Sequence, residues 1–124
     1  MALALYLAMT AWGYAGTTVH ISYTVLPENV VGLAYGDIDE CWIELDEGFE
    51  FYERTQTNLD HLVFMLTHEY GHCIRDHGHN EDPCSLMYYK LSYCYPQVIT
   101  NMDRLIAKEY RDRILINKII VGGY

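Results

Sequence analysis

The sequence predicts an α+β domain in which helices pack on one small mixed sheet. Three observations lead to this prediction. An apolar segment with helical spacing opens the chain, three short segments of strand character follow, and two longer segments with helical periodicity come after them. A chain of 124 residues has room for one hydrophobic core, so residues 1–124 are predicted to form a single domain.

The first helix is expected in the opening run MALALYLAMTAWGYAG. Leu5, Met9 and Trp12 recur at helical spacing, and Gly13 and Gly16 provide a stop. A secretory signal peptide is the alternative interpretation, because the run is apolar and rich in small residues. However, no Lys or Arg precedes it, and about fifteen residues are too few to span a bilayer. The sequence therefore favours a helix buried inside the fold.

Three strands are expected next, in TTVHISYTVLP, NVVGLAYGD and ECWIELDEG. The first is rich in β-branched residues and ends at Pro27, and a structural role is expected for His20 within it. The second ends at Gly36. The side chains of the third strand alternate between two faces, with Cys41, Ile43 and Leu45 on one and Trp42 and Glu44 on the other.

Two longer helices are expected in the second half of the chain. One begins near Thr57 or Asn58, both good N-cap residues, and runs through LDHLVFMLTHEYGHCI. The other follows Pro96 and closes the fold as an amphipathic helix. Its predicted buried face consists of apolar residues at four-residue spacing: Val98, Met102, Ile106, Tyr110 and Ile114.

The overall charge limits the class of partner. The chain has 17 acidic and 8 basic side chains, for a formal net charge of −9. Nucleic acids and anionic membranes are bound by clustered Lys and Arg, so neither is expected as a partner. A peptide or protein substrate is compatible with this charge, and the sequence leaves the oligomeric state open.

Four cysteines, Cys41, Cys73, Cys84 and Cys94, permit three pairings into two disulfides. They contain no C-x-x-C pair, so a zinc site of four thiolates is not expected. In the absence of a convincing targeting signal, we expect reduced and partly buried thiols, as in a cytosolic protein. The sequence thus slightly favours the cytoplasm, with secretion as the alternative.

The segment from His68 to Tyr89 concentrates residues that bind metals. On a helix, His68 and His72 lie about 40° apart around the axis and about 6 Å apart along it, so both can bind one ion. Glu69 lies about 100° round from His68, from where it can reach a water beside the ion without being a ligand. This is the pattern of zinc hydrolases, in which the glutamate is the general base. We therefore expect one zinc ion (Zn2+) per chain.

A catalytic zinc ion needs a third protein ligand, for which His77 and His79 are the closest candidates. On a continuing helix, His77 would stand about 180° from His68 and face away from the ion. Gly78 can instead end the helix in the left-handed conformation and bring His79 to the ion, so we predict His79. The carboxylates that remain as outside candidates are Asp76, Glu81 and Asp82.

A family resemblance rests on these residues and on the segment that follows them. The run His68-Glu69-x-x-His72, then Gly78-His79, then Ser85-Leu86-Met87-Tyr88 resembles the metzincin clan of zinc metallopeptidases. In that clan a Ser-x-Met turn passes beneath the metal as an apolar floor, and Met87 matches its methionine. The resemblance covers most of the chain, since Trp12 and the strands also fit, but its motifs are specific only between His68 and Tyr89.

The resemblance implies a minimal metzincin-like fold with an active-site helix, a Met-turn and a C-terminal helix. It also implies a catalytic role for Tyr89, because related enzymes place a tyrosine near the metal that can stabilise an oxyanion. Two departures stand out. The third histidine comes one residue later than in the long zincin motif, and Arg75 replaces the glycine of that motif.

The function expected from these residues is that of a zinc-dependent endopeptidase, with the peptide lying along the strand VVGLAYG. Two alternatives stay open. One is a zincin of another class in which Glu109 is the third ligand. The other is a zinc-stabilised, non-catalytic interaction domain, in which Cys73 or Cys84 closes the site as a fourth ligand.

Overall fold

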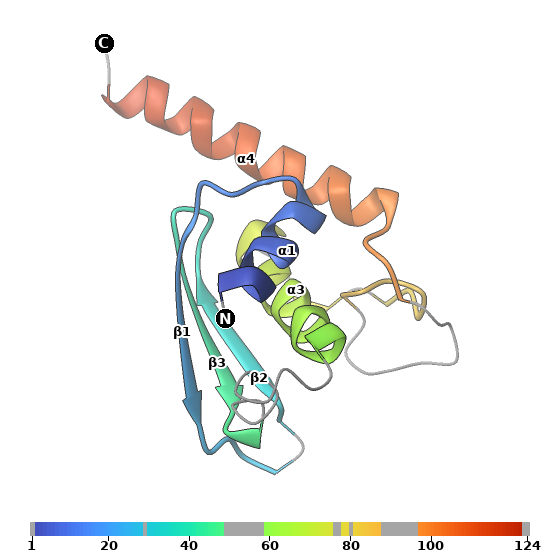
Figure 1. The fold of residues 1–124 in the computed structure, drawn as a ribbon. Coiled ribbons are helices and arrows are strands. Elements are labelled where there is room, and N and C mark those ends of the chain that lie inside the picture. Colours follow the sequence, from blue (N-terminus) through green and yellow to red (C-terminus); the bar gives the residue numbers. More distant parts are fainter. Residues whose placement is uncertain are drawn as a thin grey trace.

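The computed structural model describes residues 2–28, 30–48, 59–75, 78–79, 81–87 and 97–122, with burial described up to residue 114. These residues form an α+β fold, as the sequence predicts. The elements in chain order are helix α1 (Ala2–Trp12), strands β1 (Thr18–Thr24), β2 (Gly32–Gly36) and β3 (Glu40–Asp46), and helices α3 (Leu59–Arg75) and α4 (Asn101–Gly122). Helices α1 and α3 lie on the same side of the sheet, and α4 runs across their far end (Figure 1).

The sheet is small and mixed, with the strand order β1-β3-β2. The central strand β3 pairs with β1 in parallel and with β2 in antiparallel orientation. This order leaves β2 at an edge of the sheet, on the side where α3 packs against it. Helix α3 also contacts β3, α1 and α4, so it is the central element of the fold.

The two faces of β3 are those that the alternation of its sequence predicts. Cys41, Ile43 and Leu45 are fully buried beneath α3, whereas Trp42 and Glu44 lie on the opposite face. The β2 residues paired with the buried set, and therefore facing α3, are all small: Gly32, Ala34 and Gly36. Helix α3 can thus approach this edge of the sheet closely.

Helix α1 is packed into the fold as expected, although of the predicted Leu5, Met9 and Trp12 only Trp12 is buried. Its buried side chains are Ala4, Ala8 and Trp12. The indole Nε1 of Trp12 donates a 2.8 Å hydrogen bond to the carbonyl oxygen of Thr67 in α3. Gly13, at a φ of 74°, ends the helix as predicted. Among the described residues, no helix combines the length and apolarity needed to cross a membrane.

The buried face of α4 differs from the predicted one. Asp103, Ala107 and Tyr110 are buried, whereas Met102 is 58% exposed and Val98 lies before the helix begins. The prediction is right for Tyr110 and in part for Ile106 and Ile114, which are half-buried, and it is wrong for Met102 and Val98, because it counted apolar residues alone. Asp103 is held inside by hydrogen bonds, and it turns the helix so that Met102 faces outward.

The cysteines also differ from the prediction. Cys41 in β3 and Cys73 in α3 form a disulfide with a Cα–Cα distance of 6.0 Å. Cys84 is disulfide-bonded as well, and Cys94 lies outside the described residues. The expectation of reduced thiols is therefore wrong for these three cysteines. Their spacing in the sequence gives no sign of the pairing, because packing of α3 on the sheet is what brings Cys41 and Cys73 together.

Candidate metal centre

Three histidine side chains converge beside the C-terminal half of α3. His68 and His72 project from the helix, and His79 follows shortly after its end. The ring centroids are 5.0 Å apart for His68 and His72, 5.2 Å for His68 and His79, and 4.9 Å for His72 and His79. One possible ligand atom from each residue lies within 4.8 Å of the other two. This group could hold a metal ion.

The group contains the three histidines that the sequence predicts as ligands, including His79. Among the described residues, Glu81, Asp82 and Glu109 are not part of it, and Glu109 is exposed on α4. His77 and Asp76 lie outside the described residues, as does Tyr89. Burial decreases from His68, which is 8% exposed, through His72 to the exposed His79. The centre therefore opens to solvent on the side of His79.

A hydrogen bond orients the most buried histidine. Nδ1 of His68 lies 2.7 Å from the carbonyl oxygen of Leu86. Because a carbonyl oxygen only accepts, Nδ1 carries the proton and donates it. This leaves the lone pair on Nε2 of His68 available for a metal ion, as is usual for histidine ligands held from behind by a carbonyl group.

The environment of His68 keeps its ring neutral. The pKa of His68 is lowered from 6.5 to about 4, mainly by burial and with smaller contributions from the neighbouring His72, His79 and Arg75, while the hydrogen bond to Leu86 acts in the opposite direction. Burial also lowers the pKa of His79. Neutral imidazole is the form of histidine that binds metals, so these two side chains are prepared for an ion near neutral pH.

Glu69 lies beside the histidines with its carboxyl group buried. The residue is 4% exposed, and its Oε1 is 4.0 Å from Nε2 of His68. Burial raises the pKa of Glu69 to about 7. The two groups do not form an ion pair, because at neutral pH the His68 ring is uncharged. Gly32 of β2 leaves room for this carboxyl group, since a Cβ at position 32 would lie 3.0 Å from Oε1.

Met87 and Trp12 pack against α3 at Gly71, directly before His72. A Cβ on Gly71 would lie 2.5 Å from the Met87 sulfur and 2.6 Å from the Trp12 ring, too close for either to keep its place. Both side chains are buried, and Met87 is fully so. Gly71 therefore allows a close approach beneath the histidines. No role was predicted for it, although an internal helical glycine is itself a sign of close packing.

The turn that carries Leu86 and Met87 is held by a buried polar cluster. The Ser85 hydroxyl donates a 2.6 Å hydrogen bond to Oδ2 of Asp103 and accepts one of 3.0 Å from the backbone N–H of Met87. Asp103 also accepts from the backbone N–H and the hydroxyl of Thr100, at 3.1 and 3.0 Å. The first turn of α4 thus fixes the position of this turn.

Arg75 extends the same cluster toward His79. Its guanidinium is almost fully buried, with Nε 3.4 Å from Oδ1 of Asp103 and Nη1 donating a 3.0 Å hydrogen bond to the carbonyl oxygen of Gly78. Arg75 thereby connects the end of α3, the start of α4 and the residue before His79. The sequence shows Arg75 only as the replacement of a glycine, because nothing in the sequence places it beside Asp103.

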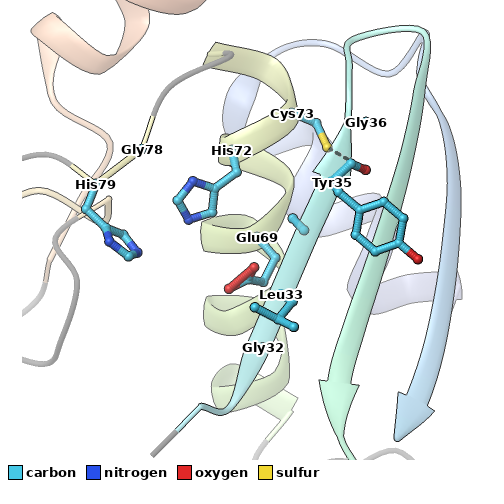
Figure 2. Close-up of a pocket in the computed structure, with 10 residues that line it drawn as sticks. Gly32, Leu33, Tyr35, Gly36, Glu69, His72, Cys73, Gly78 and His79 are labelled. Carbon is cyan, nitrogen blue, oxygen red and sulfur yellow. Dashed lines mark hydrogen bonds between the residues drawn. The ribbon is translucent and has the colours of Figure 1, made fainter. Parts of the chain in front are cut away.

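A pocket of about 480 Å³ opens in front of the centre. One wall is strand β2, from Gly32 to Gly36, and the other consists of Glu69, His72 and Cys73 on α3 together with Gly78 and His79 (Figure 2). In this view, His72 and His79 point toward the same space, and the Glu69 carboxyl group lies below them between α3 and β2.

The wall formed by β2 offers backbone groups that have no partner among the described residues. Asp46 N–H donates to Val31 O at 3.0 Å, and Asp37 N–H donates to Glu40 O at 2.8 Å. Since these groups alternate along an antiparallel strand, odd-numbered residues of β2 bond to β3. The even-numbered residues direct their N–H and C=O groups to the free edge: Gly32, Ala34 and Gly36.

Comparisons of the chain with protein families, with curated proteins and with solved structures give no match. The chemistry of the pocket is therefore the basis for assigning a function. It combines three convergent imidazoles, a buried carboxyl group and an open strand edge.

Proposed function

We propose that the protein is a zinc-dependent endopeptidase of metzincin type. His68, His72 and His79 hold the metal, and Glu69 is the general base. The observation that carries this proposal is the convergence of three imidazoles beside a buried carboxyl group, in a pocket walled by a free strand edge. Each part of that arrangement has a use in peptide hydrolysis.

The donor set suits a catalytic zinc ion. Such sites have three protein ligands and one open position, and imidazole nitrogen binds at about 2.0–2.1 Å. Tetrahedral geometry then places neighbouring nitrogens about 3.4 Å apart. The three donor atoms already lie within 4.8 Å of one another, so small side-chain rotations bring them to that spacing.

The disulfides weigh against a closed, structural zinc site. Such a site would need a fourth ligand, and Cys73 and Cys84 were the cysteines considered for that position. Both are disulfide-bonded, so neither has a thiolate to offer. Exposed Glu109 on α4 likewise lies outside the histidine group, which weighs against a zincin that uses it as the third ligand.

When bound, zinc supplies a Lewis acid that polarises a carbonyl group and makes water more acidic. Glu69 accepts a proton from the attacking water, whose oxygen bonds to the carbonyl carbon of the substrate. The C–N bond then breaks, and Glu69 gives the proton to the departing nitrogen. The 4.0 Å between Oε1 and Nε2 of His68 keeps the carboxyl group close to the ligands. A pKa of about 7 suits a group that first takes up a proton and then releases it.

The substrate is proposed to bind as an added strand along β2. Gly32, Ala34 and Gly36 provide N–H and C=O groups for main-chain hydrogen bonds, as in other cases of strand addition. Because Gly32 has no side chain, the Glu69 carboxyl group can lie close to this strand.

The test compares zinc content and cleavage in matched variants. Glu69→Gln should retain about one zinc per chain and lose about 10²–10⁴-fold in the rate of cleaving an unfolded protein, because it removes the base and not a ligand. His79→Ala should lose most of the zinc together with the activity. Glu109→Gln is the control, and it should keep both.

Elemental analysis and a quenched-peptide assay give the two readouts. Chelation of the wild type should abolish cleavage, and added zinc should restore it. A zinc-loaded wild type that cleaves no peptide, or a Glu69→Gln variant with full activity, would contradict the proposal.

A further inference from the structure

Three aromatic rings form a row across the outer face of the sheet, opposite α3. His20 in β1 and Tyr35 in β2 are each the direct cross-strand neighbour of Trp42 in β3. The His20 and Trp42 ring centroids are 5.3 Å apart with planes at 18°, and those of Tyr35 and Trp42 are 5.8 Å apart at 7°. The rings are therefore offset-stacked and nearly parallel, a favourable arrangement for aromatic groups.

The row is held at its β1 end and open at its β2 end. Nε2 of His20 lies 3.1 Å from a carboxylate oxygen of Glu40, which fixes that ring. Tyr35 stands on the edge strand and is 53% exposed, with Trp42 against one face of its ring. Among the described residues, no other ring stacks on Tyr35. Figure 2 shows its side chain on the side of β2 away from His72 and Glu69.

We infer that Tyr35 selects substrates with an aromatic side chain at one position of the bound peptide. This inference rests on the proposed function, in which the peptide adds to the free edge of β2. An added strand continues the pleat of the sheet, so the peptide residue beside Tyr35 directs its side chain to the same outer face. This holds whichever direction the peptide runs.

The spacing of the row fits a fourth ring. Neighbouring strands lie about 4.7–4.9 Å apart, and the existing rings follow one another at 5.3 and 5.8 Å. A Phe, Tyr or Trp side chain on the added strand would therefore meet the open face of Tyr35 in the same offset stack. Since stacking within the row already holds Tyr35, little side-chain freedom is lost when the substrate binds.

Among the residues of β2, only Tyr35 offers an aromatic ring to the bound peptide, so the aromatic preference is expected at one peptide position. The inward residues of β2 are glycine or alanine, and they present main chain rather than side chain to the peptide. Leu33 also lies on the outer face, two residues from Tyr35, and is 43% exposed. It offers an apolar surface without a flat ring, which makes it the matched control.

The experiment profiles cleavage of an unbiased peptide library by zinc-loaded wild type, Tyr35→Ala, Tyr35→Phe and Leu33→Ala. Wild type, Tyr35→Phe and Leu33→Ala should all enrich aromatic residues at one fixed distance from the cleaved bond. Tyr35→Ala should lose that enrichment. For a pair of peptides with Phe or Ala at that position, wild type should cleave the Phe peptide with a kcat/KM about 2- to 10-fold higher. Tyr35→Ala should cleave the two peptides with equal kcat/KM.

The outcomes separate this inference from the proposed function. Cleavage by wild type without an aromatic preference, or with a preference that persists in Tyr35→Ala, overturns the role of Tyr35 and leaves the endopeptidase in place. A loss of preference in Leu33→Ala instead of Tyr35→Ala moves the subsite and overturns the inference as well. Absence of cleavage by the zinc-loaded wild type overturns both.

Discussion

Glu69 is a residue whose pKa changes strongly on folding. Burial raises its pKa from 4.5 to about 7, so the metal-free fold favours the protonated carboxyl group. Below about pH 4.5 the group is protonated in both the folded and the unfolded protein, and it costs nothing. As the pH rises toward 7 the unfolded chain gains free energy by ionising, and the folded protein becomes relatively less stable.

This pH dependence can be tested on the metal-free protein. Relative to wild type, Glu69→Gln should gain stability as the pH rises from about 5 to about 8, by up to about 3 kcal/mol, because glutamine does not ionise. Urea unfolding in the presence of a chelator measures this difference. The lowered pKa of His68 acts in the other direction, removing stability as the pH falls below 6.5, but it is present in both proteins. A difference independent of pH would contradict the expectation.

The parts of the site that can be predicted are those whose residues are close together in the sequence. His68, Glu69 and His72 share one helix, whose geometry fixes their relative positions. His79 joins them as predicted, but the left-handed Gly78 expected from the sequence is wrong, because the φ of Gly78 lies outside that region and α3 already ends at Arg75. For Gly71 the only local sign is that it is a glycine inside a helix, which indicates close packing but does not name the partners. It matters because Met87 and Trp12 arrive from distant parts of the chain, and only packing brings them together.

At the scale of elements, the position of His79 depends on helix α4, which contributes no residue to the histidine group. Arg75 ends α3, Asp103 lies in the first turn of α4, and Ser85 belongs to the turn beneath the site. All three are buried. A buried ion pair is costly to break, because removal of one partner leaves the other charge without compensation.

We expect Arg75→Met to lower stability by about 3–5 kcal/mol, since it leaves Asp103 charged and buried. It should also weaken zinc binding by at least about 10-fold, because the Gly78 carbonyl loses its donor and His79 is held less firmly. Lys108→Met is the matched control. Lys108 pairs with Asp112 on the exposed side of α4 at 2.8 Å, and such pairs contribute less than about 1 kcal/mol.

Urea unfolding and competition with a zinc chelator measure the two effects. Zinc affinity unchanged in Arg75→Met would show that the cluster supports the fold but not the site.

Helices and strands can be predicted where the periodicity of apolar residues in the sequence matches that of the helix or strand. The alternation in ECWIELDEG predicts both faces of β3, and the α+β order follows from the succession of patterns. The buried face of α4 was not predictable in this way. A hydrophobic pattern assigns Asp103 to the surface, and only its partners Ser85, Thr100 and Arg75 explain why it is inside.

At the scale of the whole molecule, the Cys41–Cys73 disulfide joins the central strand to the helix that carries the site. The two cysteines are 32 residues apart in sequence. Closing a loop of that length in the unfolded chain corresponds to about 3–4 kcal/mol of stability in the chain-entropy description. Disulfides persist in oxidising environments, so the protein is expected to fold in one.

Thiol titration of the denatured protein without reductant should therefore find Cys41, Cys73 and Cys84 unreactive, and mass spectrometry after alkylation identifies them. The double variant Cys41→Ala/Cys73→Ala should unfold at a lower urea concentration than wild type. Its free energy of unfolding should be smaller by about 3 kcal/mol. If all three cysteines are alkylated without reduction, the reduced state expected from the sequence is the correct one, and the double variant should lose far less.

The free edge of β2 has a consequence for what the proposed enzyme can cut. Gly32, Ala34 and Gly36 can bond only to a chain that presents its own N–H and C=O groups sideways. An α-helix uses these groups internally, and a strand inside a sheet has already given them to its neighbours. Natively folded targets would therefore resist attack except at long exposed loops, and partial unfolding, more than amino-acid sequence, would decide which proteins are degraded.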